Sequence, residues 1–158
     1  MQYCRNIAGK IEIDWIDMLE QESFWDARYY AVITDKTKPA MKLTIDELTA
    51  RGKEIYVVDL SEKPDKGAFQ TVAQLPSNVD CVVIGLTKIN PADTIEDLSK
   101  KGIKKCWIHW RTETPEVKRK CIESQMQCIM GKCPMIYLGH GFSIHAMHRG
   151  VVKLLGKY

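Results

Sequence analysis

Short runs of apolar residues recur along the chain, each followed by a polar turn and an amphipathic stretch. The first run covers residues 29–33, where Tyr, Ala, Val and Ile follow one another without a polar residue. A strand that is apolar on both faces is typical of the buried middle of a parallel sheet. Pro39 suits the first position of a helix, where its missing N–H would have no partner, and Met41, Ile45 and Leu48 can share one helical face. The pattern predicts a strand, a tight loop and a helix that ends near residue 52.

The same order of strand and helix repeats toward the end of the chain. Further strands are predicted at 54–58, 80–86, 105–110 and 127–130, with a short edge strand at 68–70 and one helical turn at 71–75. Helices are predicted at 92–101 and 115–125, each opened by a proline, and Thr114 is the expected cap of the second.

Strands that alternate with helices of this length predict an α/β fold with a mostly parallel, doubly wound, Rossmann-like sheet. Right-handed crossovers favour the strand order 3-2-1-4-5-6 with helices on both faces. We expect one domain over residues 1–158, with a core at about 28–135. Amphipathic patterns add a helix at 11–24 and another at 143–155.

In such sheets, ligands bind beyond the carboxyl ends of the strands, at the point where the strand order reverses. This point lies between the strands at 29–33 and 80–86, so the loops that leave these strands and their neighbours hold the candidate ligand contacts. These residues are Thr34, Asp35, Lys36, Thr37, Lys38, Asp59, Thr87, Lys88, His109 and Arg111.

The loop at 34–38 has the chemistry of an anion site. Helix-start N–H groups, the hydroxyls of Thr34 and Thr37, and the ammonium groups of Lys36 and Lys38 all suit a phosphate. The loop lacks the glycines of the dinucleotide fingerprint, so a standard nicotinamide site is not expected. The alternative is a solvated turn with exposed lysines.

Two neighbouring strand exits are open to two interpretations each. Asp59 stands about where an acid meets a ribose hydroxyl in this fold, but such an acid also caps the following turn. Arg111 could grip a phosphate while Trp110 stacks on a base. Alternatively, Trp107 and Trp110 pack under helices and Arg111 is solvated.

Composition excludes several classes of protein. A net charge of +3 is too small to indicate nucleic-acid binding, and no apolar run approaches a membrane span of roughly 20 residues. The first residues lack the apolar core of a signal peptide. The six scattered cysteines are therefore expected to be reduced thiols in a cytoplasmic protein.

Neither a metal site nor a catalytic motif is predicted. Cys128, Cys133 and the histidines at 140, 145 and 148 lack the tight paired spacing of zinc ligands. No nucleophile elbow, zinc-protease motif or Walker loop occurs in the sequence.

Five segments, in this order, resemble those of the small single-domain CoA-binding proteins, which are similar to the nucleotide-binding part of succinyl-CoA synthetase. The segments are Ala31-Val32-Ile33 with Lys38-Pro39, residues 52–58, Leu75-Pro76 followed by residues 79–83, residues 102–107, and Cys133-Pro134. The resemblance implies a Rossmann-like domain whose phosphate loop binds CoA.

The chain departs from this family at the expected ligand edge. The family usually has Gly-Ala-Ser where this chain has Thr34-Asp35-Lys36, and Val-Asn-Pro where it has Val58-Asp59-Leu60. Gln and Gly usually stand in place of His109 and Arg111. Asp35 would repel a phosphate, so a changed or lost ligand is an alternative to CoA.

The leading hypothesis is non-catalytic binding of CoA, an acyl-CoA or a related nucleotide, with the diphosphate at 34–38 and the adenosine toward Asp59. One alternative is a small-molecule enzyme, a transferase or ligase relative, that uses His109 or a histidine of the tail as its base. Another is an interaction subunit, for example a homodimer built through the helix at 143–155.

Overall fold

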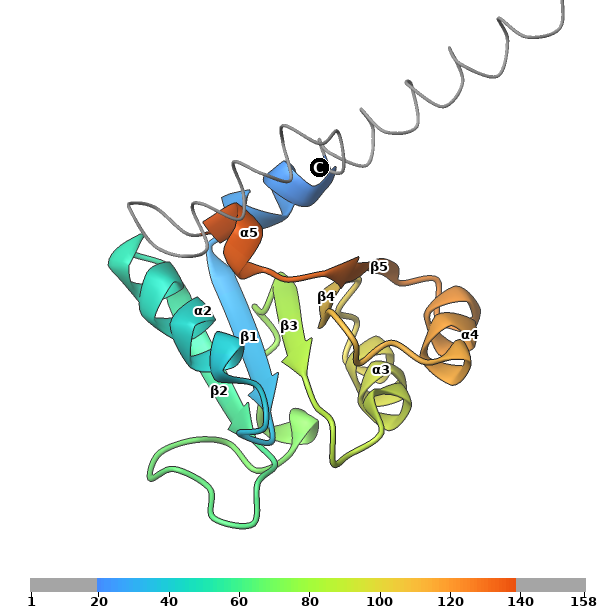
Figure 1. Cartoon of the computed structure of the whole chain (residues 1–158), viewed down its shortest axis with the longest axis horizontal. Coiled ribbons are helices and arrows are strands. Elements are labelled where there is room, and N and C mark those ends of the chain that lie inside the picture. Colours follow the sequence, from blue (N-terminus) through green and yellow to red (C-terminus); the bar gives the residue numbers. More distant parts are fainter. Residues whose placement is uncertain (1–19, 139–158) are drawn as a thin grey trace, which may run out of the picture.

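The structure, a computed structural model, describes residues 20–138. It contains one sheet of five parallel strands in the order β2-β1-β3-β4-β5 (Figure 1). The strands are β1 (Tyr29–Thr34), β2 (Glu54–Asp59), β3 (Cys81–Gly85), β4 (Lys105–His109) and β5 (Gln127–Lys132). The predicted helix at 143–155 and most of that at 11–24 lie outside the described residues.

The Rossmann-like class and the order of the predicted strands are confirmed, except that the predicted edge strand is absent from the sheet. The segment at 68–70 forms a single parallel bridge, between Phe69 and Val58, rather than a strand. The Phe69 N–H donates to the Val57 carbonyl and the Asp59 N–H to the Phe69 carbonyl, both at 2.8 Å. The chain then enters the 3-10 turn η2 (Val72–Gln74), which ends the pairing.

Helices cover both faces of the sheet (Figure 1). One face carries η1 (Phe24–Asp26), α2 (Pro39–Ala50) and the short α5 (Met135–Leu138), which the sequence did not predict. The other carries η2, α3 (Pro91–Lys100) and α4 (Pro115–Glu123). No helix among residues 20–138 has the length and apolar character needed to cross a membrane.

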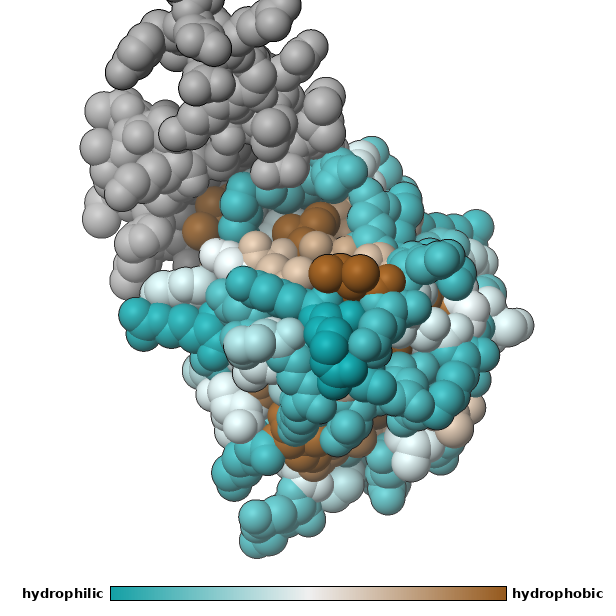
Figure 2. All heavy atoms as spheres, turned by 90° about the vertical axis from the view of Figure 1, so that its right-hand side faces the viewer, coloured by the Kyte–Doolittle hydropathy of each residue, from teal (hydrophilic) through white to brown (hydrophobic). Residues whose placement is uncertain are grey.

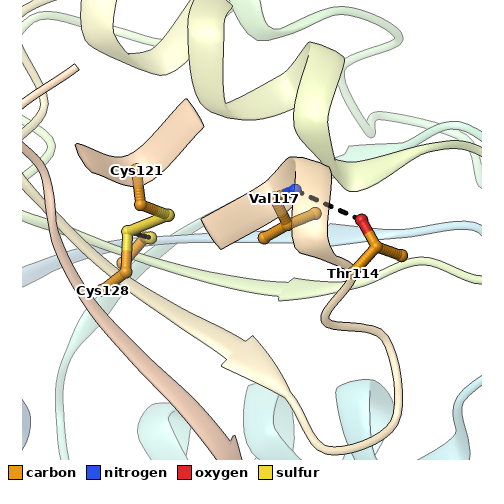
Figure 3. Close-up of a disulfide and its surroundings, with 5 residues drawn as sticks. Thr114, Val117, Cys121 and Cys128 are labelled. Carbon is orange, nitrogen blue, oxygen red and sulfur yellow. Dashed lines mark hydrogen bonds between the residues drawn. A yellow bond between two sulfur atoms is a disulfide. The ribbon is translucent and has the colours of Figure 1, made fainter. Parts of the chain in front are cut away.

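Helix starts follow the sequence signals. Each of α2, α3 and α4 opens on a proline. Asn90 accepts a hydrogen bond from the Ala92 N–H, and Thr114 accepts one from the Val117 N–H at 3.2 Å (Figure 3). These side chains satisfy N–H groups that have no partner within the helix.

The core lies on both sides of β1, which is buried from Tyr30 to Thr34. Ala31 and Ile33 pack toward α3 and α4, whereas Tyr30 and Val32 pack toward α2. The α2 side holds an aromatic cluster in which Trp107, fully buried, contacts Phe24, Trp25 and Tyr137. Outside the core, the face on the α4 side is mainly hydrophilic, with small separate hydrophobic patches (Figure 2).

The expectation of reduced thiols is wrong for one pair of cysteines. Cys121, at the end of α4, and Cys128, in β5, form a disulfide (Figure 3). Their Cα atoms are 6.4 Å apart because the turn after α4 folds directly back into β5. Cys81, Cys106 and Cys133 are free.

Candidate functional site

The loops that leave β1 and β3 meet at the carboxyl edge of the sheet, and Asp35 joins them. This side chain is buried, with 4% of its surface exposed. One carboxylate oxygen accepts hydrogen bonds from the N–H groups of Thr87 and Lys88, both at 2.8 Å. The other accepts from the Thr37 N–H at 3.1 Å. Backbone donors that could face a phosphate are therefore bound to a carboxylate of the protein itself.

Two hydroxyls extend this arrangement. Thr87 Oγ1 donates to Thr37 Oγ1 at 2.6 Å, and Thr37 Oγ1 donates in turn to Asp35. Burial alone would raise the pKa of Asp35, but the hydrogen bonds from Thr37, Lys88 and Thr87 outweigh it and hold the pKa below its ordinary value. Asp35 is consequently ionised at neutral pH.

Lys36 lies with its backbone in the left-handed region, at φ 63°, and its ammonium turns toward the loop after β2. Its Nζ lies 2.9 Å from Asp59, 2.8 Å from Asp65 and 2.6 Å from the Lys63 carbonyl. Three acceptors thus hold the ammonium, which leaves little of its charge for a ligand.

Asp59 holds the turn that follows β2. It accepts hydrogen bonds from the N–H groups of Ser61 at 3.0 Å and Asp65 at 2.8 Å. Burial would raise its pKa, but the hydrogen bonds from Ser61, Lys36 and Asp65 lower the pKa to about 2. Its oxygens face this turn and Lys36.

A groove of about 700 Å³ begins beside this cluster and follows the outer edge of β2, between α2 and the loop before Phe69. Its floor is apolar and its rim holds four lysines and two aspartates. Of these, Lys38 and Lys66 form no ion pair or side-chain hydrogen bond with any residue between 20 and 138. The lining is Thr34, Lys36, Lys38, Pro39, Lys42, Ile45, Asp46, Ile55, Tyr56, Val57, Asp65, Lys66, Gly67, Ala68 and Phe69.

A second hollow, of about 680 Å³, lies on the other side of Asp35 between the loops after β3 and β4. Thr87, Lys88 and Arg111 all line it. Arg111 lies at φ 65° with its guanidinium 4.1 Å from the centre of the Trp110 ring. Trp110 is 45% exposed, so the pair lies on the surface.

His109, at the end of β4, is buried. Its Nδ1 lies 2.8 Å from the Trp110 carbonyl and donates to it in the neutral ring. Burial lowers the pKa of His109 because it disfavours the charged ring, and the positive charge of Lys38 adds to this effect. His109 is therefore neutral at pH 7.

The sequence-predicted residues thus fall into separate groups. Asp35 accepts hydrogen bonds from Thr37 of its own loop, which begins after Thr34, and from Thr87 and Lys88 of the loop after β3. Lys36 forms an ion pair with Asp59. Lys38 lines the groove and Arg111 the second hollow. The groove is also lined by four residues that the sequence did not single out, and they are Lys42, Asp65, Lys66 and Phe69. For two of them, Asp65 and Lys66, the polar loop at 61–67 was the only indication in the sequence.

A family model described as a CoA binding domain matches residues 28–139. No curated protein matches the chain.

Three solved structures illustrate the likeness in fold. A conserved hypothetical protein from Pyrococcus furiosus is 22% identical with a TM-score of 0.60, over 70% of this chain and 98% of that one. A hypothetical protein from Pyrococcus horikoshii is 20% identical with a TM-score of 0.63, over 75% and 87%. A dinucleotide-forming acetyl-coenzyme A synthetase from Ca. Korarchaeum cryptofilum, in complex with phosphate and ADP, is 19% identical with a TM-score of 0.50, over 64% and 25%.

Proposed function

Because the chain belongs to the CoA-binding domain family, we propose that it binds CoA or an acyl-CoA in the groove beside β2 and catalyses no reaction on it. The observation that carries the position is the groove itself. It starts at Thr34 and Lys38, at the carboxyl edge where ligands of such sheets bind, and its volume of about 700 Å³ is within the range of small-molecule sites.

The chemistry of the groove matches the two ends of CoA. CoA carries phosphate groups at one end and a long, largely uncharged arm at the other. The rim offers Lys38, Lys42 and Lys66 to the phosphates, and the floor offers Ile45, Ile55 and other apolar side chains to the rest of the ligand. Lys36 pairs with Asp59 and Asp65, and Lys42 pairs with Asp46, so the positive charge open to an anion is that of Lys38 and Lys66.

Asp35 moves the proposed phosphate position away from the backbone amides of the loop. Those amides already bind its carboxylate, and a phosphate placed there would meet a like charge. Lys38 is nearby and has no anionic partner between residues 20 and 138. We therefore place the phosphates at Lys38 and Lys66. The earlier hypothesis, with the diphosphate on the loop amides and the adenosine at Asp59, is replaced.

The absence of catalysis is proposed from the state of the acids and bases at the edge. The lowered pKa of Asp35 makes it a weak proton acceptor, and Asp59 is held by Lys36 and two N–H groups. Incubation of the protein with acetyl-CoA should release no free thiol above the buffer rate. A protein-dependent release that is lost in His109→Ala would instead support the enzyme hypothesis.

Binding is tested with a charge reversal. Lys38→Glu should weaken CoA binding at least tenfold, about 1.4 kcal/mol, because an attractive charge becomes repulsive. Isothermal titration calorimetry gives the dissociation constants. The matched control is Lys118→Glu, which makes the same change of charge at an exposed position of α4. Equal affinities of the parent and Lys38→Glu would remove Lys38 from the site.

A further inference from the structure

Three cysteines from three different elements converge beneath α4. They are Cys106 of β4, Cys121 of α4 and Cys128 of β5, and their sulfur atoms all lie within 4.8 Å of one another. Cys106 and Cys128 are partners in the register of neighbouring parallel strands, so their side chains lie on the same face of the sheet. Cys121 approaches from the helix above, as Figure 3 shows for the Cys121–Cys128 pair.

The cluster is enclosed. Cys106 is fully buried, Cys121 is 3% exposed and Cys128 is half-buried. Val117 and Met126 belong to the same apolar core cluster. Among residues 20–138, no histidine or carboxylate joins the three sulfurs as a possible ligand.

A disulfide explains only two of these cysteines. The third, Cys106, lies with its sulfur 3.0 Å from that of Cys128 although it takes no part in the bond. Three convergent thiol groups are instead the donor set of a soft metal ion, because thiolate sulfur selects Cu(I) and Zn(II) over harder cations.

The spacing fits such an ion. With metal–sulfur bonds of about 2.3 Å, three sulfurs in a plane around one ion stand about 4 Å apart. The Cys121 and Cys128 sulfurs are bonded and the Cys106 and Cys128 sulfurs lie 3.0 Å apart, so after reduction these separations must widen by about 1–2 Å, a movement shared between side chains that already face one another. Cu(I) accepts trigonal coordination, whereas structural zinc requires a fourth ligand.

We propose that Cys106, Cys121 and Cys128 bind one Cu(I) ion when the protein is reduced. Formation of the Cys121–Cys128 disulfide removes two of the three ligands, so the disulfide and the metal exclude each other. A dithiol reductant breaks the S–S bond by supplying two electrons and two protons, and closes its own disulfide. The metal then displaces protons from the thiols into solvent.

The test uses the full chain, reduced with a dithiol and freed of it under anaerobic conditions. Titration with Cu(I) against a colorimetric Cu(I) chelator should show one high-affinity ion per chain, with a sulfur-to-copper charge-transfer band in the ultraviolet. Cys106→Ser should lower the affinity at least 100-fold. Cys81→Ser, which removes a buried free thiol from the adjacent strand β3, should leave it unchanged.

Several results would overturn the proposal. They are the absence of copper uptake by the reduced parent, equal affinity of Cys106→Ser and the parent, and uptake by the oxidised chain with its disulfide intact. Tighter binding of Zn(II) than of Cu(I) in a parallel titration would overturn the assignment to Cu(I). Circular dichroism checks that each variant folds. If the Cys106→Ser variant does not fold, the Cys121→Ala variant takes its place in the titration. CoA affinity is measured by titration of the same samples. Loss of copper binding with unchanged CoA affinity would concern the cysteine cluster alone and leave the proposed function in place.

Discussion

Asp35 acts at the carboxyl edge as an internal anion. Its two oxygens accept three backbone N–H groups and one hydroxyl, which is the kind of donor set that a phosphate oxygen would use. The loops after β1 and β3 are therefore closed on each other without a ligand. An external phosphate near Lys38 must tolerate this negative charge.

Asp35→Asn removes the charge of Asp35 but replaces one of its two accepting oxygens with an NH2 group, so urea unfolding of the variant is measured as well, to show whether the loops stay folded. We expect the affinity for CoA to rise about fivefold, since removing a like charge a few ångströms away is worth about 1 kcal/mol in a solvated setting. Calorimetry of the variant measures the change. Asp97→Asn, on the exposed side of α3, makes the same change of charge as a control. An affinity equal to that of the parent would show that Asp35 does not compete with the bound anion.

Asp59 makes stability depend on pH. Its pKa falls from 3.8 to about 2 in the folded protein, so folding favours its ionised form. The stabilisation is fully present above pH 3.8 and is lost as pH falls through about 2. Asp59→Asn should therefore cost about 2–3 kcal/mol at pH 7, because the pKa of Asp59 falls from 3.8 to about 2 on folding. In urea unfolding, a difference between parent and variant that is as large at pH 2 as at pH 7 would contradict this.

At the scale of single residues, the sequence predicts a location but not the partners. Thr34 to Lys38 and Thr87 were placed at one edge of the sheet because parallel strands bring their exits together. The bond from the Thr87 N–H to Asp35 spans 52 residues, and no periodicity encodes it. Lys36 was expected to serve a phosphate for its charge, yet Asp59 and Asp65 hold its ammonium.

The elements were predictable where local signals agree. Prolines open α2, α3 and α4, and apolar runs mark the buried strands, so these elements appear within a few residues of the predicted positions. The edge segment at 68–70 lacks such agreement, and one bridge to Val58 is all that it forms. The cluster of Cys106, Cys121 and Cys128 depends on the register between β4 and β5, which spacing along the chain does not reveal.

The contact between β3 and α2 depends on Gly85, the last residue of β3. A Cβ at this position would overlap the Met41 side chain, because the Met41 Cγ would be only 2.5 Å away from it. Met41 is 1% exposed, so it has little room to move. Gly85→Ala should therefore destabilise the protein by about 1–3 kcal/mol in urea unfolding.

A double-mutant cycle tests the cause. Met41→Ala removes the overlapping atoms, so Gly85→Ala should cost clearly less in that background than alone. Additive effects of the two substitutions would mean that the cost arises elsewhere, for example in the strand backbone.

In the molecule as a whole, Asp35 and the residues bonded to it, Thr37, Thr87 and Lys88, separate two hollows at the carboxyl edge of the sheet. The groove along β2 carries the excess of lysines, whereas Arg111 in the second hollow rests on Trp110. Family membership alone favours neither. Lys38 and Lys66 favour the groove, because their ammonium groups have no ion-pair partner within residues 20–138.

Hydrogen–deuterium exchange distinguishes the two hollows in one experiment. Bound CoA should slow exchange along the groove, in the backbone of residues 38–42, 55–57 and 65–69, because the ligand covers these amides and disfavours local opening. Residues 111–116 of the second hollow should exchange at the same rate with and without CoA. Lys38→Glu serves as the control, since the protection should disappear at the same CoA concentration. Protection confined to residues 86–91 and 111–116 would place the ligand in the second hollow, and Arg111 would then take the phosphate role proposed for Lys38.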